Sequence, residues 1–274
     1  MRTKCMKPIT VVIVVIFVLA LLAGCGSKAG SADSDMAYIK GNKAMKVGIT
    51  IYAPMNYYDN SGTLIGFDTE FTNALCEKLG VTPEFIEINW DTKETELAAK
   101  NIDCIWNGLT VTEERKKNIQ FSDAYIKNKQ VVVIRVADGG VYASLDALAD
   151  AKLCAEIGSA GEDAVLANEV LSGANYTAMA KQTDTLMEVK AGTSDAAILD
   201  YTAAKALVGE GTSYSDLMIM PTVELDAEEY AIGFRIGSDI VPEINKIIAE
   251  LIADGTLDAI AEKYELTDSL LSNQ

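Results

Sequence analysis

Hydrophobic positions along most of this chain follow two periods, and the two periods alternate. Short apolar runs of the kind that form buried strands are separated by stretches in which apolar residues recur every three or four positions, as on one face of a helix. The strands that this pattern predicts are 45–51, 83–88, 102–106, 130–136, 153–157, 194–199 and 230–234. The helices that it predicts are 66–79, 92–100, 145–148, 162–171, 183–191, 201–208, 240–251 and 257–264.

The order of these elements predicts the α/β fold class. From 45 to 106 the order is strand, helix, strand, helix, strand, which is typical of a parallel, doubly wound sheet. A second series of alternating strands and helices begins near Ser144. The two series are alike in kind, without an exact internal repeat. A length of 274 residues is enough for one large domain or two of ordinary size.

The first residues have the pattern of a targeting segment. Three basic residues within the first seven positions precede an apolar run from Ile9 to Ala23, and small residues come directly before Cys25. This order is typical of a secretory signal, and the small residues before the cysteine resemble a bacterial lipobox. We therefore predict that residues 1–24 are a lipoprotein signal peptide. The alternative is an uncleaved anchor helix, for which the apolar run is somewhat short.

Cleavage at that point would make Cys25 the lipid-bearing N-terminus. Residues 26–34 are rich in Gly, Ser and Ala, so we predict a flexible tether over 25–41. The protein is then expected outside the cytoplasm, anchored to the cell membrane through the lipid on Cys25.

Charge and composition narrow the classes of partner and of chemistry. The formal net charge is -17, and it falls to -20 once the three basic residues of the signal are removed, because that segment contains no acidic residue. Such a balance argues against nucleic acid as a partner and against binding to anionic lipid surfaces. The chain contains no His, which removes the commonest general base, the commonest zinc ligand and any Ser-His or Cys-His pair.

Cysteine usage predicts neither a disulfide framework nor a metal site. Cys5 falls within the signal and Cys25 takes the lipid, which leaves an odd number, Cys76, Cys104 and Cys154. No CxxC motif is present. The remaining three lie in apolar patterns and are interpreted as small buried hydrophobic residues. We predict no metal and no cofactor.

The stretch from Asn107 to Arg115 carries the clearest chemical signal. It follows the apolar strand 102–106 with an Asn-Gly turn, and Thr112 then has the place of a helix N-cap. A cation in the first turn, where Arg115 falls, does not suit the positive end of the helix dipole. A fixed guanidinium there can clamp a planar anion, and a carboxylate fits best. The alternative is a surface arginine paired with Glu113 or Glu114.

Two further places carry candidate chemistry, each with an ordinary alternative. The turn 158–161 precedes a helix, and its N–H groups can form an anion site, or it is a plain connection between a strand and a helix. Asp200 follows the strand 194–199 at the edge where open α/β sheets bind ligands, or it caps the next helix. Tyr52 and Trp106 near strand ends can form an apolar wall, or they are core aromatics.

Together these residues resemble the amino-acid-binding proteins of ABC importers, which are two-lobed binding proteins of the periplasmic type. The resemblance covers roughly 44–266, and its motifs agree in order and spacing. They are Tyr52-Ala53-Pro54, Gly66-Phe67-Asp68, Ile102-Asp103, the run from Thr110 to Lys116, Phe121-Ser122-Asp123, Gly158-Ser159 and Asp200.

The resemblance implies a role for each matching position. Arg115, Thr110 and the N–H of Ala160 would bind the α-carboxylate of the ligand. Asp200 and the carbonyl of Gly108 would bind its α-ammonium. The residues implied to pack on the ligand or to line the same corner are Tyr52, Trp106, Asn107 and Leu109.

The resemblance also implies the domain organisation. The first lobe would be 42–128 plus 229–274, and the second lobe, 129–228, would be inserted into it. The two crossings near Lys129 and Glu229 would form a two-segment hinge. The implied partners are a free amino acid and the permease subunits of an ABC importer, and the binding protein is expected to act as a monomer.

Some positions depart from the pattern of the family. Met55 stands where a Phe is usual, and Ala160 stands where a Thr is frequent, which leaves only its N–H. Members that bind cationic amino acids often have an Asp just before the first turn, but 49–51 has none. The resemblance thus favours a neutral polar ligand, cystine included.

The alternative is a dehydratase-like enzyme on the same fold, acting on a small carboxylic acid. It would need a general acid in the cleft. Glu87 is the candidate that the sequence offers, and the strand pattern does not fix the direction of its side chain.

Overall fold

A computed structural model describes residues 34–223, 225 and 227–273. The predicted signal peptide, Cys5, Cys25 and the first part of the predicted tether lie outside the described residues. Residues from Asp35 onward make one unit, and the fold below is the fold of that unit. Over the described part of the chain, no helix has the length and apolar character that crossing a membrane requires.

The first lobe is built on a five-stranded sheet. Its strand order is β4-β1-β5-β13-β6, where β1 is Ala44–Ile49, β4 Thr82–Glu87, β5 Cys104–Ile105, β6 Ile119–Phe121 and β13 Gly233–Arg235. The strand β1 pairs in parallel with β4 and β5, whereas β13 is antiparallel to β5 and β6. The parallel arrangement predicted for the first three strands is therefore confirmed.

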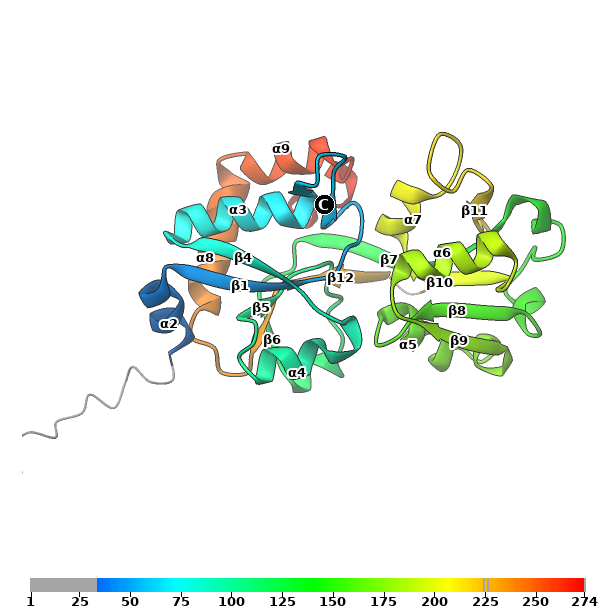
Figure 1. Cartoon of the computed structure of the whole chain (residues 1–274), viewed down its shortest axis with the longest axis horizontal. Helices are drawn as coiled ribbons and strands as arrows, with labels where there is room; N and C mark the ends of the chain where they lie inside the picture. The colour runs from blue at the N-terminus through cyan, green and yellow to red at the C-terminus, as the bar shows by residue number, and fades with distance from the viewer. Residues whose placement is uncertain (1–33, 224, 226, 274) are drawn as a thin grey trace, which may run out of the picture. The chain divides into compact units, whose positions relative to one another are not determined.

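Helices cover both faces of this sheet. They are α3 Phe67–Leu79, α4 Lys93–Ala98, α8 Val241–Ala253 and α9 Thr256–Lys263. In Figure 1, α3 and α9 lie on one side of the sheet and α4 on the other. The face under α3 is aromatic: the ring of Phe71 lies 4.9 Å from that of Trp106 and 5.3 Å from that of Tyr125. Because helices cover both of its faces, the sheet is doubly wound.

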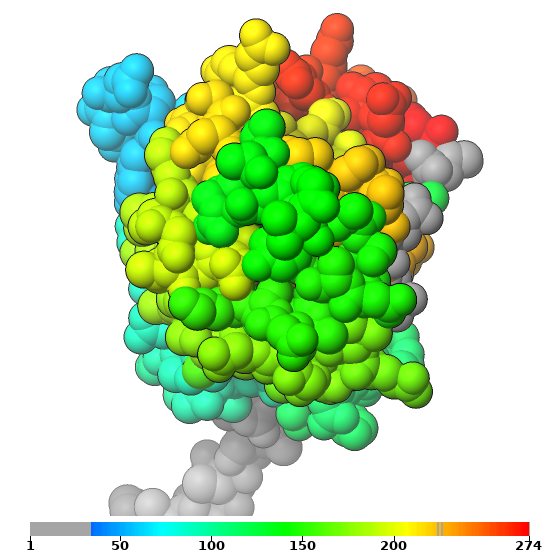
Figure 2. All heavy atoms as spheres, turned by 90° about the vertical axis from the view of Figure 1, so that its right-hand side faces the viewer, coloured from blue at the N-terminus to red at the C-terminus, as the bar shows by residue number. Residues whose placement is uncertain are grey.

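The second lobe has its own sheet, in the order β11-β7-β10-β8-β9. Its strands are β7 Ile126–Arg135, β8 Lys152–Glu156, β9 Asn175–Met179, β10 Ala196–Asp200 and β11 Leu217–Ile219. Its helices are α5 Ala160–Ala167, α6 Gln182–Ala191 and α7 Tyr201–Leu207. Figure 2 looks onto the end of this lobe, where the green chain that follows β7 covers the centre.

Two paired strands connect the lobes. The long strand β7 leaves the first lobe and becomes part of the second sheet, and β12 (Ala227–Tyr230) runs back beside it in the opposite direction (Figure 1). Lys129 lies opposite Ala227, and Lys127 lies opposite Glu229. The two crossings predicted near Lys129 and Glu229 both fall within this strand pair.

The end of the predicted tether is a helix instead. Residues Asp35–Asn42 form α2, and Ile39 on this helix is fully buried. The carboxylate of Asp35 accepts hydrogen bonds from Arg235, with 2.8 Å between Nη2 and Oδ1. The prediction of a tether over 25–41 was therefore wrong for its last residues, because the Gly- and Ser-rich composition on which it rested ends before Asp35.

Several observed strands were not predicted from the sequence. They include the paired short strands β2 (Tyr57–Tyr58) and β3 (Leu64–Ile65), the short strands β6 and β11, and most of β12. The edge strand β9, Asn175–Met179, was also missed, and its residues are all at least partly exposed. The cysteines behave as predicted: Cys76, Cys104 and Cys154 are buried and free. Burial raises the pKa of the Cys76 thiol to about 12 and that of Cys154 to about 11, so both stay protonated.

Candidate ligand-binding site

A small cavity lies between the lobes, at the carboxyl ends of their central strands. Its volume of about 10 Å³ is room for about one water molecule. Seven of the nine predicted ligand-binding residues line it, namely Tyr52, Asn107, Gly108, Thr110, Arg115, Ala160 and Asp200. The other lining residues are Thr50, Trp90, Glu156, Ser159 and Gln182.

Arg115 is buried at the cavity, with 5% of its surface exposed. Its Nη1 donates to the carbonyl of Thr110 at 2.9 Å, and its Nη2 donates to the carbonyl of Gly158 on the second lobe at 3.1 Å. The alternative of a surface ion pair is excluded, because Glu113 and Glu114 pair with Lys116 and Lys117.

The local structure that positions Arg115 differs from the predicted helix start. Residues Arg115–Lys117 form a single 3₁₀ turn. The hydroxyl of Thr112 does accept a hydrogen bond from the N–H of Arg115, at 3.1 Å, as a cap would. A three-residue turn carries little dipole, so burial and hydrogen bonding place the guanidinium rather than opposition to a helix dipole. Burial also lowers the pKa of Arg115.

The turn at Gly108 is fixed by the buried carboxylate of Asp68, which the sequence indicated as part of a motif but without a role in the site. Gly108 has φ of +58°, and its N–H donates to Oδ2 of Asp68 at 2.8 Å. The other oxygen of Asp68 accepts from the hydroxyl of Tyr125 at 2.8 Å. Burial raises the pKa of Asp68 to about 6. A Cβ added at Gly108 would lie 2.9 Å from the ring of Tyr52, so glycine is required for space as well as for conformation.

Asn107 lines the cavity, but its amide is already committed to the protein. Its Oδ1 accepts from the N–H and the hydroxyl of Thr50, at 3.1 and 2.6 Å. Its Nδ2 donates to the carbonyl of Thr50 at 3.0 Å and to Oδ1 of Asn56 at 2.6 Å. An amide can donate two hydrogen bonds and accept two, so none is left for a ligand. Asn107 therefore shapes the first-lobe side of the cavity.

A row of hydroxyl groups joins the two sides of the cavity at Tyr52. The hydroxyl of Tyr52 lies 2.6 Å from that of Thr202 on the second lobe and 3.0 Å from that of Tyr230. The hydroxyl of Tyr230 in turn donates to Oδ1 of Asp200 at 2.8 Å. Burial, together with the charge of Asp200, raises the pKa of Tyr52. Tyr52 is therefore more than part of the predicted apolar wall, because its hydroxyl also makes a hydrogen bond across the cleft.

Asp200 faces this cavity rather than the backbone of the next helix. It occupies the N-cap position of α7, but its side chain makes no capping hydrogen bond. Its carboxylate accepts from Asn128 at 2.7 Å, from Gln130 at 2.8 Å and from Gln182. The alternative of a helix cap is thus wrong. The amide donors come from alternate positions of β7, which place Asn128 and Gln130 on one face of the sheet.

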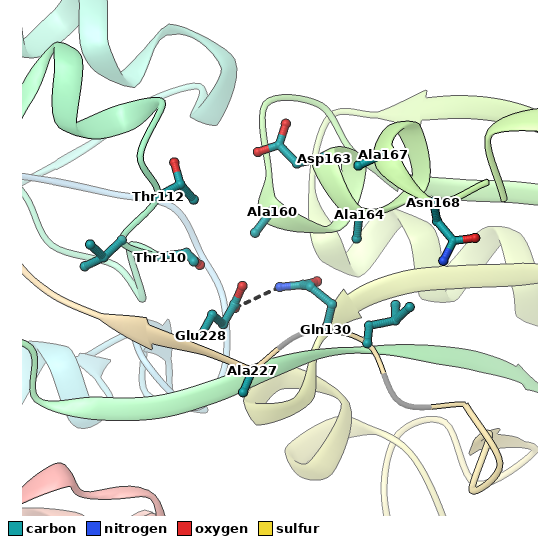
Figure 3. A pocket seen from close by; sticks show the side chains of 12 residues that line it. Thr110, Thr112, Gln130, Ala160, Asp163, Ala164, Ala167, Asn168, Ala227 and Glu228 are labelled. Carbon is teal, nitrogen blue, oxygen red and sulfur yellow. Dashed lines mark hydrogen bonds between the residues drawn. The ribbon is translucent and has the colours of Figure 1, made fainter. Parts of the chain in front are cut away.

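Glu228 on the returning strand β12 shares those donors. Its Oε1 accepts from Asn128 and, at 2.9 Å, from Gln130. Burial first, and then the charge of Asp200, raise the pKa of Glu228. Glu228 and Gln130 line a groove of about 480 Å³. Figure 3 shows their hydrogen bond, with Thr110 and Thr112 on one side of the groove and residues of α5 on the other. Glu228 was not among the predicted site residues. The sequence signal that could have indicated this part of the site is the pair of amides, Asn128 and Gln130, on one face of a strongly β-branched strand.

The turn 158–161 has the geometry predicted for an anion site. Ser159 caps α5, because its Oγ accepts from the N–H of Glu162 at 3.1 Å, and Glu162 accepts in return from the N–H of Gly158 at 2.7 Å. Ala160 is the first residue of α5 and lines the cavity. Backbone N–H groups in the first turn of a helix have no partner inside the helix, so they are available to an anion.

Two predicted residues, Trp106 and Leu109, do not reach the cavity. Both are fully buried: Trp106 packs edge-on against Phe71, and Leu109 belongs to an apolar cluster with Ile119. Sequence proximity to Asn107 and Gly108 suggested them, but both side chains pack into the apolar interior of the first lobe. The tryptophan that does line the cavity is Trp90, two residues after the end of the second predicted strand.

Lys93 adds a contact between the lobes that no pattern in the sequence indicates. It is 4% exposed, and its Nζ donates to the carbonyl of Gly158 at 2.8 Å and to that of Trp90 at 3.2 Å. Burial, and then the charge of Arg115, lower the pKa of Lys93 to about 8. One carbonyl of the second lobe therefore accepts from two cations of the first.

This fold and this site can be set beside known proteins. The L-cystine-binding protein TcyJ of Escherichia coli strain K12 is 27% identical over 251 residues, which are 91% of this chain and 92% of that protein. The arginine-binding extracellular protein ArtP of Bacillus subtilis is 28% identical over 94% of this chain and 98% of that protein. A crystal structure of a mutant of ArgBP from T. maritima superposes with a TM-score of 0.77 at 30% identity, covering 84% of this chain and 98% of that one.

A family model also matches the chain over residues 45–267, which is most of its length and includes every cavity-lining residue named above. The chain therefore belongs to the bacterial extracellular solute-binding proteins, family 3.

Proposed function

We propose that the solute is a free amino acid, which this protein captures between its lobes and delivers to an ABC importer. The observation that carries the proposal is the pairing of charges across one cavity. Arg115 lines it from the first lobe and Asp200 from the second, and each is 5% exposed. An amino acid carries a carboxylate and an ammonium on one carbon, so a single ligand can satisfy both groups.

The site residues keep the roles expected for them. Arg115, Thr110 and the N–H of Ala160 bind the α-carboxylate, and Asp200 and the carbonyl of Gly108 bind the α-ammonium. Tyr52 packs on the ligand side chain, and the ring of Trp90 joins it there. The opposite charges of Arg115 and Asp200 support these roles. The relatives named for cystine and arginine support an amino acid as the ligand.

Ligand entry requires the lobes to separate. The cavity has room for about one water molecule, which is far less than an amino acid needs. Opening would bend the strand pair β7 and β12. A ligand with contacts on both lobes then favours the closed state over the open one, because only the closed state offers both sets of contacts.

The location and the remaining partners belong to the same proposal. We infer a signal peptide over 1–24, a lipid on Cys25 that anchors the protein to the cell membrane, and a monomer that meets the permease. The lobe boundaries remain 42–128 with 229–274, and 129–228. A Cys25→Ser variant should fold and bind ligand but should not incorporate radioactive palmitate. Labelling of that variant would contradict the lipid anchor.

The enzyme alternative would use Glu156, a carboxyl in the cavity with 3% of its surface exposed. Burial, and then Asp200, raise the pKa of Glu156 in the cavity to about 8, and a protonated carboxyl at neutral pH is what a general acid needs. The earlier candidate, Glu87, is exposed and accepts from Tyr58 at 2.8 Å, outside the cavity. Incubation with prephenate or arogenate separates the two functions: turnover would support a dehydratase, and binding without turnover would support transport.

A thermal-shift panel of the twenty amino acids and cystine tests the proposed function. A ligand at a hundredfold over its dissociation constant adds about 2.7 kcal/mol to the stability, which is a clear shift in melting temperature. Matched controls are the N-acetyl and the carboxamide derivatives of the best ligand, each of which removes one α-charge. Both should lose the shift. A panel in which no amino acid produces a shift would overturn the proposal.

A further inference from the structure

Glu156 is an ionisable residue of the cavity whose carboxyl group has no hydrogen-bond donor in the described chain. It is the last residue of β8, it is 3% exposed, and it lines the cavity together with Trp90 and Gln182. Among residues 34–223, 225 and 227–273, no group donates a hydrogen bond to its carboxylate. A nearly buried carboxyl without a donor is unfavourable unless it is protonated or paired.

We infer that Glu156 binds a cationic group on the side chain of the ligand, so that the preferred ligand is a basic amino acid. The inference rests on the proposed function, because it assumes that Arg115 and Asp200 bind the two α-groups. Glu156 lies on β8, so the second lobe would select the ligand by its side chain.

A balance of charges supports this assignment. The zwitterionic α-groups of an amino acid compensate Arg115 and Asp200. Glu228 already accepts from two amides, and Lys93 already donates to two carbonyls. Among these groups, only Glu156 is left without a hydrogen-bonding partner in the described chain, and a cationic side chain of the ligand would supply one.

The surroundings of Glu156 make the protonation state sensitive to the ligand. The charged groups that act on it are Asp200 and Asp184, which favour its neutral form, and Lys93 and Lys181, which favour its ionised form. Burial and Asp200 dominate and raise the pKa of Glu156 to about 8. A cationic side chain would favour the carboxylate, so its binding at pH 7 should release a proton. A neutral side chain should not.

The earlier expectation of a neutral ligand rested on the absence of an acidic residue in 49–51. The first strand of the first lobe lacks the acidic residue often found in binders of cationic amino acids, and Thr50 lines the cavity there. Glu156 supplies a carboxylate from the opposite lobe instead.

The test compares L-arginine with L-citrulline, which has nearly the same shape and the same α-groups but no side-chain charge. Calorimetry is run on the wild type, on Glu156→Gln, and on Glu169→Gln, an exposed substitution of the same kind on the second lobe. We expect the wild type and Glu169→Gln to bind arginine at least about thirtyfold more tightly than citrulline. We expect Glu156→Gln to lose most of that preference by weakening arginine alone.

A second measurement does not depend on the variant folding. Titrations in buffers with different ionisation enthalpies count the protons released. Wild type should release more protons with arginine than with citrulline, and protons that the shared α-ammonium displaces from other groups cancel in that comparison. Equal affinity and equal proton release for the two ligands would overturn the inference while leaving amino-acid capture intact. Failure of every amino acid to bind would instead overturn the proposed function.

Discussion

The two sides of the cavity are built in opposite ways. On the first-lobe side, Asn107 and the N–H of Gly108 are fully hydrogen-bonded within their own lobe, and the ligand-facing charge is the cation Arg115. On the second-lobe side the charged groups are the carboxyls of Asp200 and Glu156, and a third carboxyl, Glu228, lies next to Asp200.

This difference teaches how a ligand can drive closure. The first-lobe side is rigid before the ligand arrives, so it can bind the carboxylate end alone. Closing the empty cleft brings carboxyl groups into a space with almost no water, which is unfavourable. The ammonium of the ligand removes that penalty, and the closed state is then stabilised in proportion to the contacts that only it can make.

The largest effect is expected from removing the cation of the first-lobe side. Arg115→Ala leaves the carboxylate of the ligand desolvated and poorly paired, which typically costs about 2–5 kcal/mol and weakens binding at least about thirtyfold. Calorimetry measures it, with circular dichroism to check the fold. Arg115→Lys should also lose affinity, because one ammonium cannot reproduce the two-pronged guanidinium. Affinity near that of the wild type in both variants would mean that Arg115 only joins the lobes through Gly158.

The second prediction concerns the opposite charge. Asp200→Asn keeps the shape but leaves the ammonium without its anion, so affinity should fall by about tenfold or more. Arg115 can still bind the carboxylate from one side, so closure should weaken more than capture. Small-angle scattering at one moderate ligand concentration should show less compaction for the variant than for wild type. Equal compaction and affinity would show that the amides of Asn128 and Gln130 suffice.

The sequence predicted the two sides unequally well, and the reason is physical. Arg115 and Gly108 lie in one short stretch with a turn signal, so a local pattern reveals them. The second-lobe side is assembled from β7, β8, β10 and β12, and no local pattern in the sequence shows that Glu156 and Glu228 each lie close to Asp200. Periodicity found most helices and strands for the same reason: their burial is a local property, whereas the short strands β6 and β11 exist only through their partners.

A smaller effect, on stability and affinity together, is expected at Gly108. A Cβ there would meet the ring of Tyr52 at 2.9 Å, in a backbone conformation with φ of +58°. The matched control is Gly62→Ala, which has φ of +81° but no atom within 4 Å of the added Cβ. The control should lose about 1–2 kcal/mol from the conformation alone. Thermal unfolding should show a larger loss for Gly108→Ala, with weaker binding. Equal losses would mean that space at Tyr52 is not limiting.

The smallest effect concerns pH and the ligand-free protein. Glu156 has a raised pKa in the closed cavity, about 8, so the closed state binds more protons than the unfolded chain between roughly pH 4.5 and 8. Its contribution to stability is therefore fully present below the unfolded pKa and is lost as the pH rises through 8. Glu156→Gln removes this dependence, so the stability of the variant relative to wild type should increase between pH 5 and 8, by at most about 1.4 kcal/mol per pH unit and by less in proportion as the empty lobes stand open.

The size of that change reports which state the ligand-free protein occupies. Chemical denaturation across this pH range, on wild type, Glu156→Gln and Glu169→Gln, measures it. Open lobes let water solvate Glu156, which returns its pKa toward the ordinary value and removes the slope. Asp68 and Glu228 also have raised pKa values, but they are present in all three proteins, so their effects cancel when the proteins are compared. A gain in the stability of Glu156→Gln relative to wild type as the pH rises, with no such gain for Glu169→Gln, would mean that the empty lobes spend much of their time closed. No difference among the three proteins would mean that they stand open, and that the ligand supplies the closing free energy.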